Sequence, residues 1–191
     1  LAHTMNVEFD GLSIKYMLNE LVPGMKLQFC AGRGLSNALP KFTTNNTPYA
    51  ETESSVPAID LAGIVFTAYD DGQYLAKAQY YYASNLIDRI NTTSPAIETV
   101  GNLHSATAML MVNGLGESDY LDESTFFLSG AVTQTDPNAK GMLGSNESEV
   151  GYSYWTGLQV PSVFSDDGRM GLEYNYGSQY WRSITYAEDT N

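Results

Sequence analysis

Apolar and polar residues alternate along most of this chain with a period of two. In residues 12–18, for example, Leu12, Ile14 and Tyr16 share one parity and polar or small residues take the other. Because successive side chains on a β-strand point to opposite faces of the sheet, such a segment is predicted to be a strand with one apolar face. The same alternation recurs in residues 25–30, 61–69, 74–82, 104–112, 126–133, 152–160 and 170–176. The sequence therefore predicts an all-β protein.

Three segments are less clear. Residues 104–112 alternate weakly, and a helix is the rival interpretation because Ala and Met are helix formers. At Asp10 and Gly11 the phase of the alternation slips, which indicates either a two-residue turn or a bulge in one longer strand. A last candidate strand passes through Trp181, Ser183 and Thr185.

The predicted connections alternate between short and long. Short turns are expected at residues 19–24, 70–72, 113–122 and 166–168, and long aperiodic loops at residues 34–58, 85–100 and 134–149. An antiparallel up-and-down meander with this order places every short turn at one end of the sheet and every long loop at the other, as transmembrane β-barrels do. This order favours the bulge at Asp10 and Gly11, because a turn there would set two short connections side by side.

The two faces of the predicted strands match the wall of such a barrel. A water-filled lumen requires polar or small side chains, whereas the opposite face meets lipid and carries aromatic girdles at the two interfaces. The candidates for the lumen are Lys26, Gln28, Lys77, Gln79, Arg169, Glu173 and Asn175. The candidates for the lipid interface are Tyr74, Tyr80, Tyr82, Tyr152, Tyr174 and Tyr176. A soluble antiparallel β-sandwich gives the same alternation and is the alternative.

Composition narrows the function classes. The 191 residues are expected to form a single β-barrel segment, incomplete at both ends. Nine basic residues against 22 acidic ones give a formal net charge of −13, which excludes a nucleic-acid partner because a phosphate backbone attracts Lys and Arg. No run of apolar residues is long enough for a transmembrane helix, so the chain is either soluble or meets a membrane as strands.

Motifs for catalysis or metal binding are not found in the sequence. Cys30 is a lone cysteine, and His104 is interpreted as an interfacial or turn-proximal side chain rather than as a general base. The paired aspartates at residues 70–71 and 166–167 each precede a glycine and fit tight turns. The acidic residues between 117 and 123 lack the spacing of a calcium loop and are expected to form a solvated turn. We therefore expect no enzyme activity, no cofactor and no metal.

Three segments carry a family resemblance: LVPGMKLQFCAGRG, MLGSNESEVGYSYWTGLQ and GLEYNYGSQYWRSITYAEDT. They resemble an uncharacterised bacterial family, described as a domain of unknown function, of porin-like outer-membrane β-barrel proteins. Family members are longer, with a signal peptide before this region and more strands after it. The resemblance thus implies an internal fragment of a barrel in the bacterial outer membrane, and it brings no catalytic residues.

These observations lead to three hypotheses of function. The first is a porin-like channel for the passive passage of small solutes or ions, in contact with outer-membrane lipid, with the three long loops shaping its mouth. The acidic excess makes a mild cation preference the expectation for that channel. The second is a structural barrel or sheath around a partner protein. The third is a soluble, secreted carbohydrate-binding β-domain whose exposed Tyr and Trp residues stack on sugars.

Overall fold

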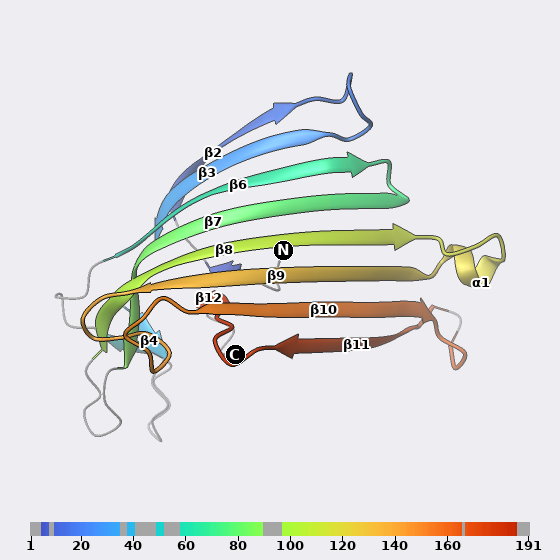
Figure 1. Cartoon of the computed structure of the whole chain (residues 1–191). Coiled ribbons are helices and arrows are strands. Elements are labelled where there is room, and N and C mark those ends of the chain that lie inside the picture. Colours follow the sequence, from blue (N-terminus) through green and yellow to red (C-terminus); the bar gives the residue numbers. More distant parts are fainter. Residues whose placement is uncertain are drawn as a thin grey trace.

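The fold consists of one large antiparallel sheet with two small strand pairs. The structure is a computed structural model that describes residues 5–7, 10–34, 38–40, 49–51, 58–89, 97–165 and 167–186. Eight strands form the main sheet in the order β11-β10-β9-β8-β7-β6-β3-β2 (Figure 1). They are β2 (Asp10–Met17), β3 (Lys26–Gly34), β6 (Ile59–Asp70), β7 (Tyr74–Arg89), β8 (Ile97–Asn113), β9 (Thr125–Pro137), β10 (Val150–Pro161) and β11 (Arg169–Gly177). The predicted all-β antiparallel meander is confirmed, and the sheet is not closed.

The remaining elements are short. Strands β4 (Ala38–Pro40) and β5 (Tyr49–Glu51) pair with each other, and β1 (Met5–Val7) pairs in parallel with β12 (Ile184–Tyr186). A single helical turn, α1 (Asp119–Asp122), begins at the N-cap Ser118 and lies between β8 and β9.

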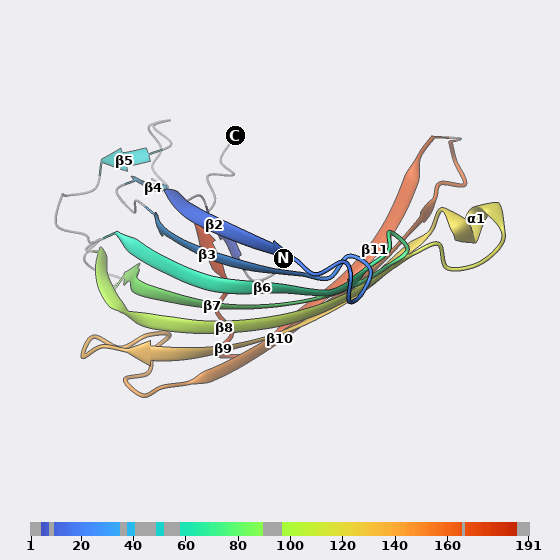
Figure 2. The ribbon, with the colours of Figure 1, turned by 90° about the horizontal axis from the view of Figure 1, so that it is seen from above.

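The main sheet is bent into an open trough (Figure 2). Strands β2 and β11 form its two free edges, and the β1-β12 pair lies inside the trough over the concave face. Every β2 residue and all of β11 except Met170 are exposed, as expected for strands with a neighbour on one side only.

All four connections predicted to be short lie at one end of the sheet, and backbone hydrogen bonds link three of them. Asp70 N donates to Pro23 O at 3.0 Å, which joins the β2-β3 and β6-β7 turns. Asn113 N donates to Gln73 O at 2.7 Å, which joins β6-β7 to the connection that holds α1. Asp71 accepts from the backbone N–H groups of Tyr74 and Gln73, and these bonds lower the pKa of its carboxyl below the usual value. Asp71, one of the paired aspartates at residues 70–71, therefore stabilises the β6-β7 turn.

The predicted loop over residues 85–100 is wrong at both ends, because β7 continues to Arg89 and β8 begins at Ile97, and residues 90–96 lie outside the described residues. Asn85 has φ 58°, Gly101 has φ 144°, and the β7-β8 register shifts between Ala83 and Ile87. These bulges change which parity faces which side, so a paired stretch reads as aperiodic. At this end of the sheet β9 also extends further than predicted, to Pro137, which shortens the predicted loop over residues 134–149. Residues 104–112 lie in strand β8, which removes the helix alternative.

Two predictions near the ends of the chain also need correction. Asp10 and Gly11 are neither a turn nor a bulge: both lie in β2 and pair in unbroken register with Arg33 and Gly32. The preceding strand β1 belongs to a separate sheet with β12, and residues 8–9 between β1 and β2 lie outside the described residues. The strand predicted through Trp181 begins only at Ile184 and does not join the main sheet.

Gly24 tests the packing of the turns. Its φ is +65°, and a Cβ would lie 2.1 Å from Asp70 O. Gly24→Ala is expected to lower the free energy of unfolding by about 2–4 kcal/mol, from left-handed strain plus displacement of the neighbouring turn. Gly72, with φ +91° and open space around it, is the matched control, and Gly72→Ala is expected to cost only about 1–2 kcal/mol. Urea unfolding followed by tryptophan fluorescence measures both, and equal losses would contradict the packing of these turns.

Candidate functional site

The sheet has two chemically distinct faces, and their exposure is the reverse of that in a soluble sheet. On the convex side, called the outer face, Leu110 is 58% and Tyr152 is 53% exposed. On the concave side, called the inner face, Ser105 is 2% and Ser153 is 3% exposed. A soluble antiparallel sheet buries its apolar face and leaves its polar face in water. Here small and hydroxyl-bearing side chains of the inner face are covered and the large apolar ones of the outer face are not, and the buried apolar cluster of the protein lies at one end of the inner face.

Two predicted lumen lysines lie in one row across the inner face. Lys26 on β3 pairs in register with Thr67 on β6, and Thr67 pairs with Lys77 on β7. Lys26 Nζ lies 3.6 Å from a carboxylate oxygen of Asp70, whereas Lys77 has no ion-pair partner within the described ranges. The hydroxyl between the two lysines is 1% exposed as part of Thr67, and no described residue bonds to it.

The predicted lumen glutamines form the adjacent row. Gln28 and Gln79 both pair with Val65, one on each side of it. Gln28 donates to Ser13 Oγ at 2.7 Å, and Gln79 accepts from the Tyr81 hydroxyl at 3.2 Å. The structure therefore brings Lys26, Gln28, Lys77 and Gln79 together on three adjacent strands.

The other three lumen candidates lie on the inner face of β11, at the free edge. Glu173 accepts from Trp155 Nε1 at 3.1 Å, and Asn175 accepts from Ser153 Oγ at 3.4 Å. Arg169 instead reaches the α1 connection, where it donates to Glu123 O at 2.7 Å. All three are on the predicted face, but the width of the sheet separates them from the lysine row.

Residues 178–183, here called the strap, cross the inner face after β11. Tyr152 N donates to Ser178 Oγ at 2.9 Å, and Arg182 Nη2 donates to Ile87 O at 3.1 Å on β7. The strap lies directly on the backbone of β10, because a Cβ on Gly151 would be 2.2 Å from Tyr180 O. It therefore covers the hydroxyl-rich part of the inner face.

An apolar cluster occupies the inner face near the long-loop end. Ala83, Leu86 and Leu103 are fully buried there, and Met142 of the β9-β10 loop packs against them. Lys140 forms an ion pair with Glu98, and Asn138 N donates to Val100 O at 2.8 Å, so this loop is fixed to β8. The loop predicted to shape the mouth thus folds inward over the concave face.

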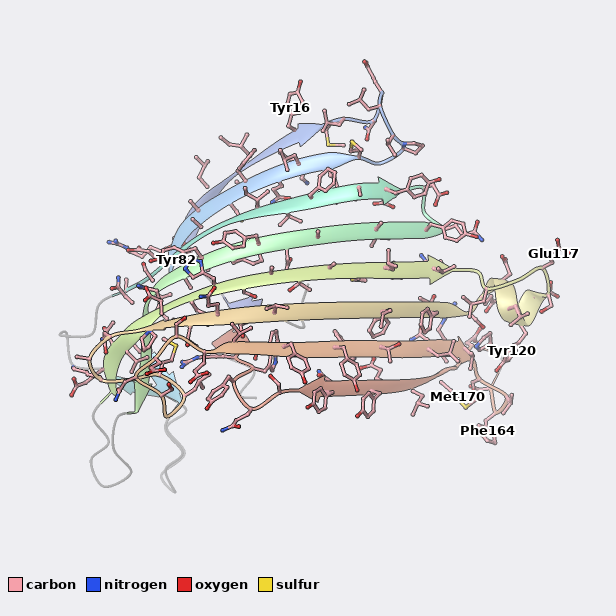
Figure 3. All side chains as sticks on the ribbon, viewed as in Figure 1. Tyr16, Tyr82, Glu117, Tyr120, Phe164 and Met170 are labelled. Atoms are coloured by element: carbon pink, nitrogen blue, oxygen red, sulfur yellow. The ribbon has the colours of Figure 1, made fainter. Side chains whose placement is uncertain are left out.

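The predicted interface aromatics all lie on the outer face. On β10 and β11 the Tyr154 ring lies 5.3 Å from the Tyr176 ring and 5.7 Å from the Tyr174 ring, between centroids. Tyr152 lies near the long-loop end of β10, Tyr80 and Tyr82 lie near the middle of β7, and Tyr74 lies at the start of β7 near the short turns. Figure 3 labels Tyr16 and Tyr82 on this face.

His104 has a structural role on the outer face. Its Nδ1 lies 2.7 Å from the Tyr80 hydroxyl, and its ring packs 4.9 Å from that of Tyr82 on the outer face. No group of three potential metal ligands occurs among the residues that the structure describes. Within the same residues, no helix has the length and apolar character needed to cross a bilayer.

Sequence reasoning did not select Thr67, Ser105, Thr107 or Arg182. The first three have buried hydroxyls without a partner in the described part of the chain. Thr is a common strand residue, so only the strand register shows that Thr67 lies between two lysines. The sequence pattern predicts a strand around Arg182, whereas the structure places this residue in the strap.

Comparison with known proteins adds one match. A family model described as "Protein of unknown function (DUF3373)" matches residues 1–191. Searches of curated proteins and of solved structures found no match.

Gly151→Ala tests whether the strap lies on the sheet. The new methyl group clashes with Tyr180 O, and a strain of about 1.4 kcal/mol would open the strap roughly tenfold more often. We expect trypsin to cleave after Arg182 about ten times faster than in the unmodified protein. Gly130→Ala is the matched control, because a Cβ there meets nothing within 4 Å on the outer face. Equal cleavage rates for the two variants would show that the strap does not occupy this position.

Proposed function

We propose that this chain, which belongs to the DUF3373 family, forms part of the wall of a porin-like β-barrel in a bacterial outer membrane. The observation that carries the proposal is the reversed exposure of the two faces. Leu110, Leu128 and Tyr152 point away from the covered side of the sheet, while Ser105, Ser129 and Ser153 point into it. In this proposal lipid covers the outer face, and the inner face lines a passage for small solutes or ions.

The free energy gained when apolar side chains leave water supports a bilayer as the surroundings of the outer face. Full burial of one Leu or Phe side chain is worth about 1.5–3 kcal/mol relative to exposure in water. The convex face exposes large apolar or aromatic side chains on all eight strands, and these gain most in hydrocarbon, where their contact with water ends. Seven of the eight strands of the main sheet are long enough, because a transmembrane strand needs about 9–11 residues, and β3, β6, β7, β8, β9, β10 and β11 have 9 to 17 residues. The edge strand β2 has eight residues.

The short connection between β10 and β11 supports contact of this end of the sheet with a membrane interface. It exposes Val163 and Phe164, and Figure 3 shows Phe164 at the tip of this end of the sheet, near Met170. Aromatic side chains are enriched where a barrel meets the membrane interface. In the proposed barrel the short connections lie at the periplasmic end. The β9-β10 loop with Met142, which folds over the inner face, lies at the extracellular end.

The free edges of β2 and β11 fit a wall that continues. Unpaired backbone N–H and C=O groups are costly in hydrocarbon, so a spanning sheet must close on itself. We infer that further strands pair with β2 and β11 in the complete barrel.

Val132→Lys separates a lipid-facing surface from a water-facing one. Val132 lies near the middle of β9 on the outer face and is 49% exposed. In a bilayer a lysine near the middle of a membrane-spanning strand costs about 2–4 kcal/mol, whereas replacement of an exposed apolar residue in water costs within about 0.5 kcal/mol. We expect the larger loss for the full-length protein folded into phospholipid vesicles, measured by urea unfolding. The matched control is Leu21→Lys, because Leu21 is 74% exposed in the β2-β3 turn and should tolerate the change. Near-zero losses for both variants would contradict lipid contact at Val132.

Planar-bilayer recording tests the passage itself. The full-length protein is expected to give discrete single-channel steps whose conductance rises with salt concentration, because the inner face is polar. Heat-denatured protein in the same detergent is the control for leak. Inserted, folded protein that gives no steps across a range of salts would remove the channel hypothesis and leave the structural barrel.

A further inference from the structure

We propose that Lys26, Thr67 and Lys77 form a binding site for a small oxyanion, of the phosphate or carboxylate class, on the inner face. The site rests on the proposed function only for its access, because solutes reach the inner face through the passage. The proposal replaces the expectation of a cation preference drawn from the net charge of the chain.

The strand register gives the geometry of the site. Lys26, Thr67 and Lys77 occupy one row on three adjacent strands, which places the backbones of the two lysines about 10 Å apart. The side chains of both lysines are long enough to converge over the residue between them. The backbones of two lysines thus flank one short hydroxyl side chain, with the Lys26 ammonium 3.6 Å from Asp70 and the Lys77 ammonium without an ion-pair partner among the described residues.

The Thr67 hydroxyl is the independent indication of a ligand. It is buried, it lies on the inner face between two cations, and no described residue bonds to it. Buried polar groups in folded proteins almost always have a partner. A ligand oxygen held between the ammonium groups of Lys26 and Lys77 would supply that partner.

The distribution of charge favours an anion over a cation. In its short-turn half, the described inner face of the main sheet carries the cations Lys15, Lys26, Lys77 and Arg169 and the carboxylates Asp70 and Glu173. Glu98, at the long-loop end of β8, is paired with Lys140. Other acidic residues, such as Asp71, Glu117 and Glu147, lie in the connections. The net charge of −13 therefore describes the chain as a whole and not the inner face around Lys77.

The neighbouring side chains suit an oxyanion as well. Ammonium groups bind phosphate and carboxylate as point charges, and amide groups add directional hydrogen bonds. Gln28 and Gln79 lie one step along the same strands, on the same face. Lys26 forms an ion pair with Asp70. Lys77 has no ion-pair partner among the described residues, so it is the cation whose charge a ligand would neutralise.

Phosphate binding tests the site without any need for ionic current. Isothermal titration of the detergent-folded, full-length protein with inorganic phosphate is expected to show binding that Lys77→Gln weakens at least fivefold. Lys140→Gln removes the same charge in the β9-β10 loop and is expected to leave the affinity unchanged. Thr67→Val removes the hydroxyl with little change of shape, so it should weaken phosphate binding without lowering stability in the absence of phosphate.

Ion selectivity in bilayers then separates this proposal from the channel proposal. In a potassium chloride gradient the reversal potential is expected to indicate chloride preference, and Lys77→Gln should shift it toward potassium more than Lys140→Gln does. Phosphate binding that depends on Lys77 in a protein without conductance would uphold the site and overturn the channel. Conductance without phosphate binding, or equal effects of the two lysine substitutions, would overturn the site.

Discussion

Lipid contact of the convex face is the condition on which the proposed barrel depends. Eight strands direct Leu, Ile, Phe, Val and Tyr side chains to a face that no part of the described chain covers. Their partners on the concave face are mostly small or hydroxyl-bearing, which lets the strap and the β9-β10 loop approach the backbone closely. A sheet with this division is stable where its apolar face leaves water, and a bilayer provides that environment.

The inner face has three regions along and across the sheet. The apolar cluster with Met142 fills the long-loop end, the strap covers part of β10 and β9, and the lysine row lies on β3, β6 and β7. Solutes that pass along the proposed wall would meet the cations on the side that the strap leaves less covered. Thus the arrangement of polar groups on the inner face, more than the overall charge, is expected to decide which solutes interact with it.

The period-two pattern predicted much of this structure, because a side chain's face depends only on parity until a bulge intervenes. Lys26, Gln28, Lys77 and Gln79 lie on the predicted face for this reason, as do Tyr152 and Tyr174. Prediction failed where parity changes: the bulges at Asn85 and Gly101 made paired residues resemble a loop. The position of the strap and the pairing of Thr67 between two lysine-bearing strands depend on contacts between distant segments. No local sequence pattern carries that information.

Spin-label accessibility along β8 tests the central claim most directly. Single labels at positions 105 to 110 in the full-length, vesicle-reconstituted protein report contact with oxygen, which concentrates in lipid, and with a water-soluble nickel complex. Labels at Ala106, Ala108 and Leu110 are predicted to be accessible to oxygen and shielded from nickel, while those at Ser105, Thr107 and Met109 are not accessible to oxygen from the lipid. Nickel accessibility at Ala106, Ala108 and Leu110 would show that the outer face lies in water and would contradict the account.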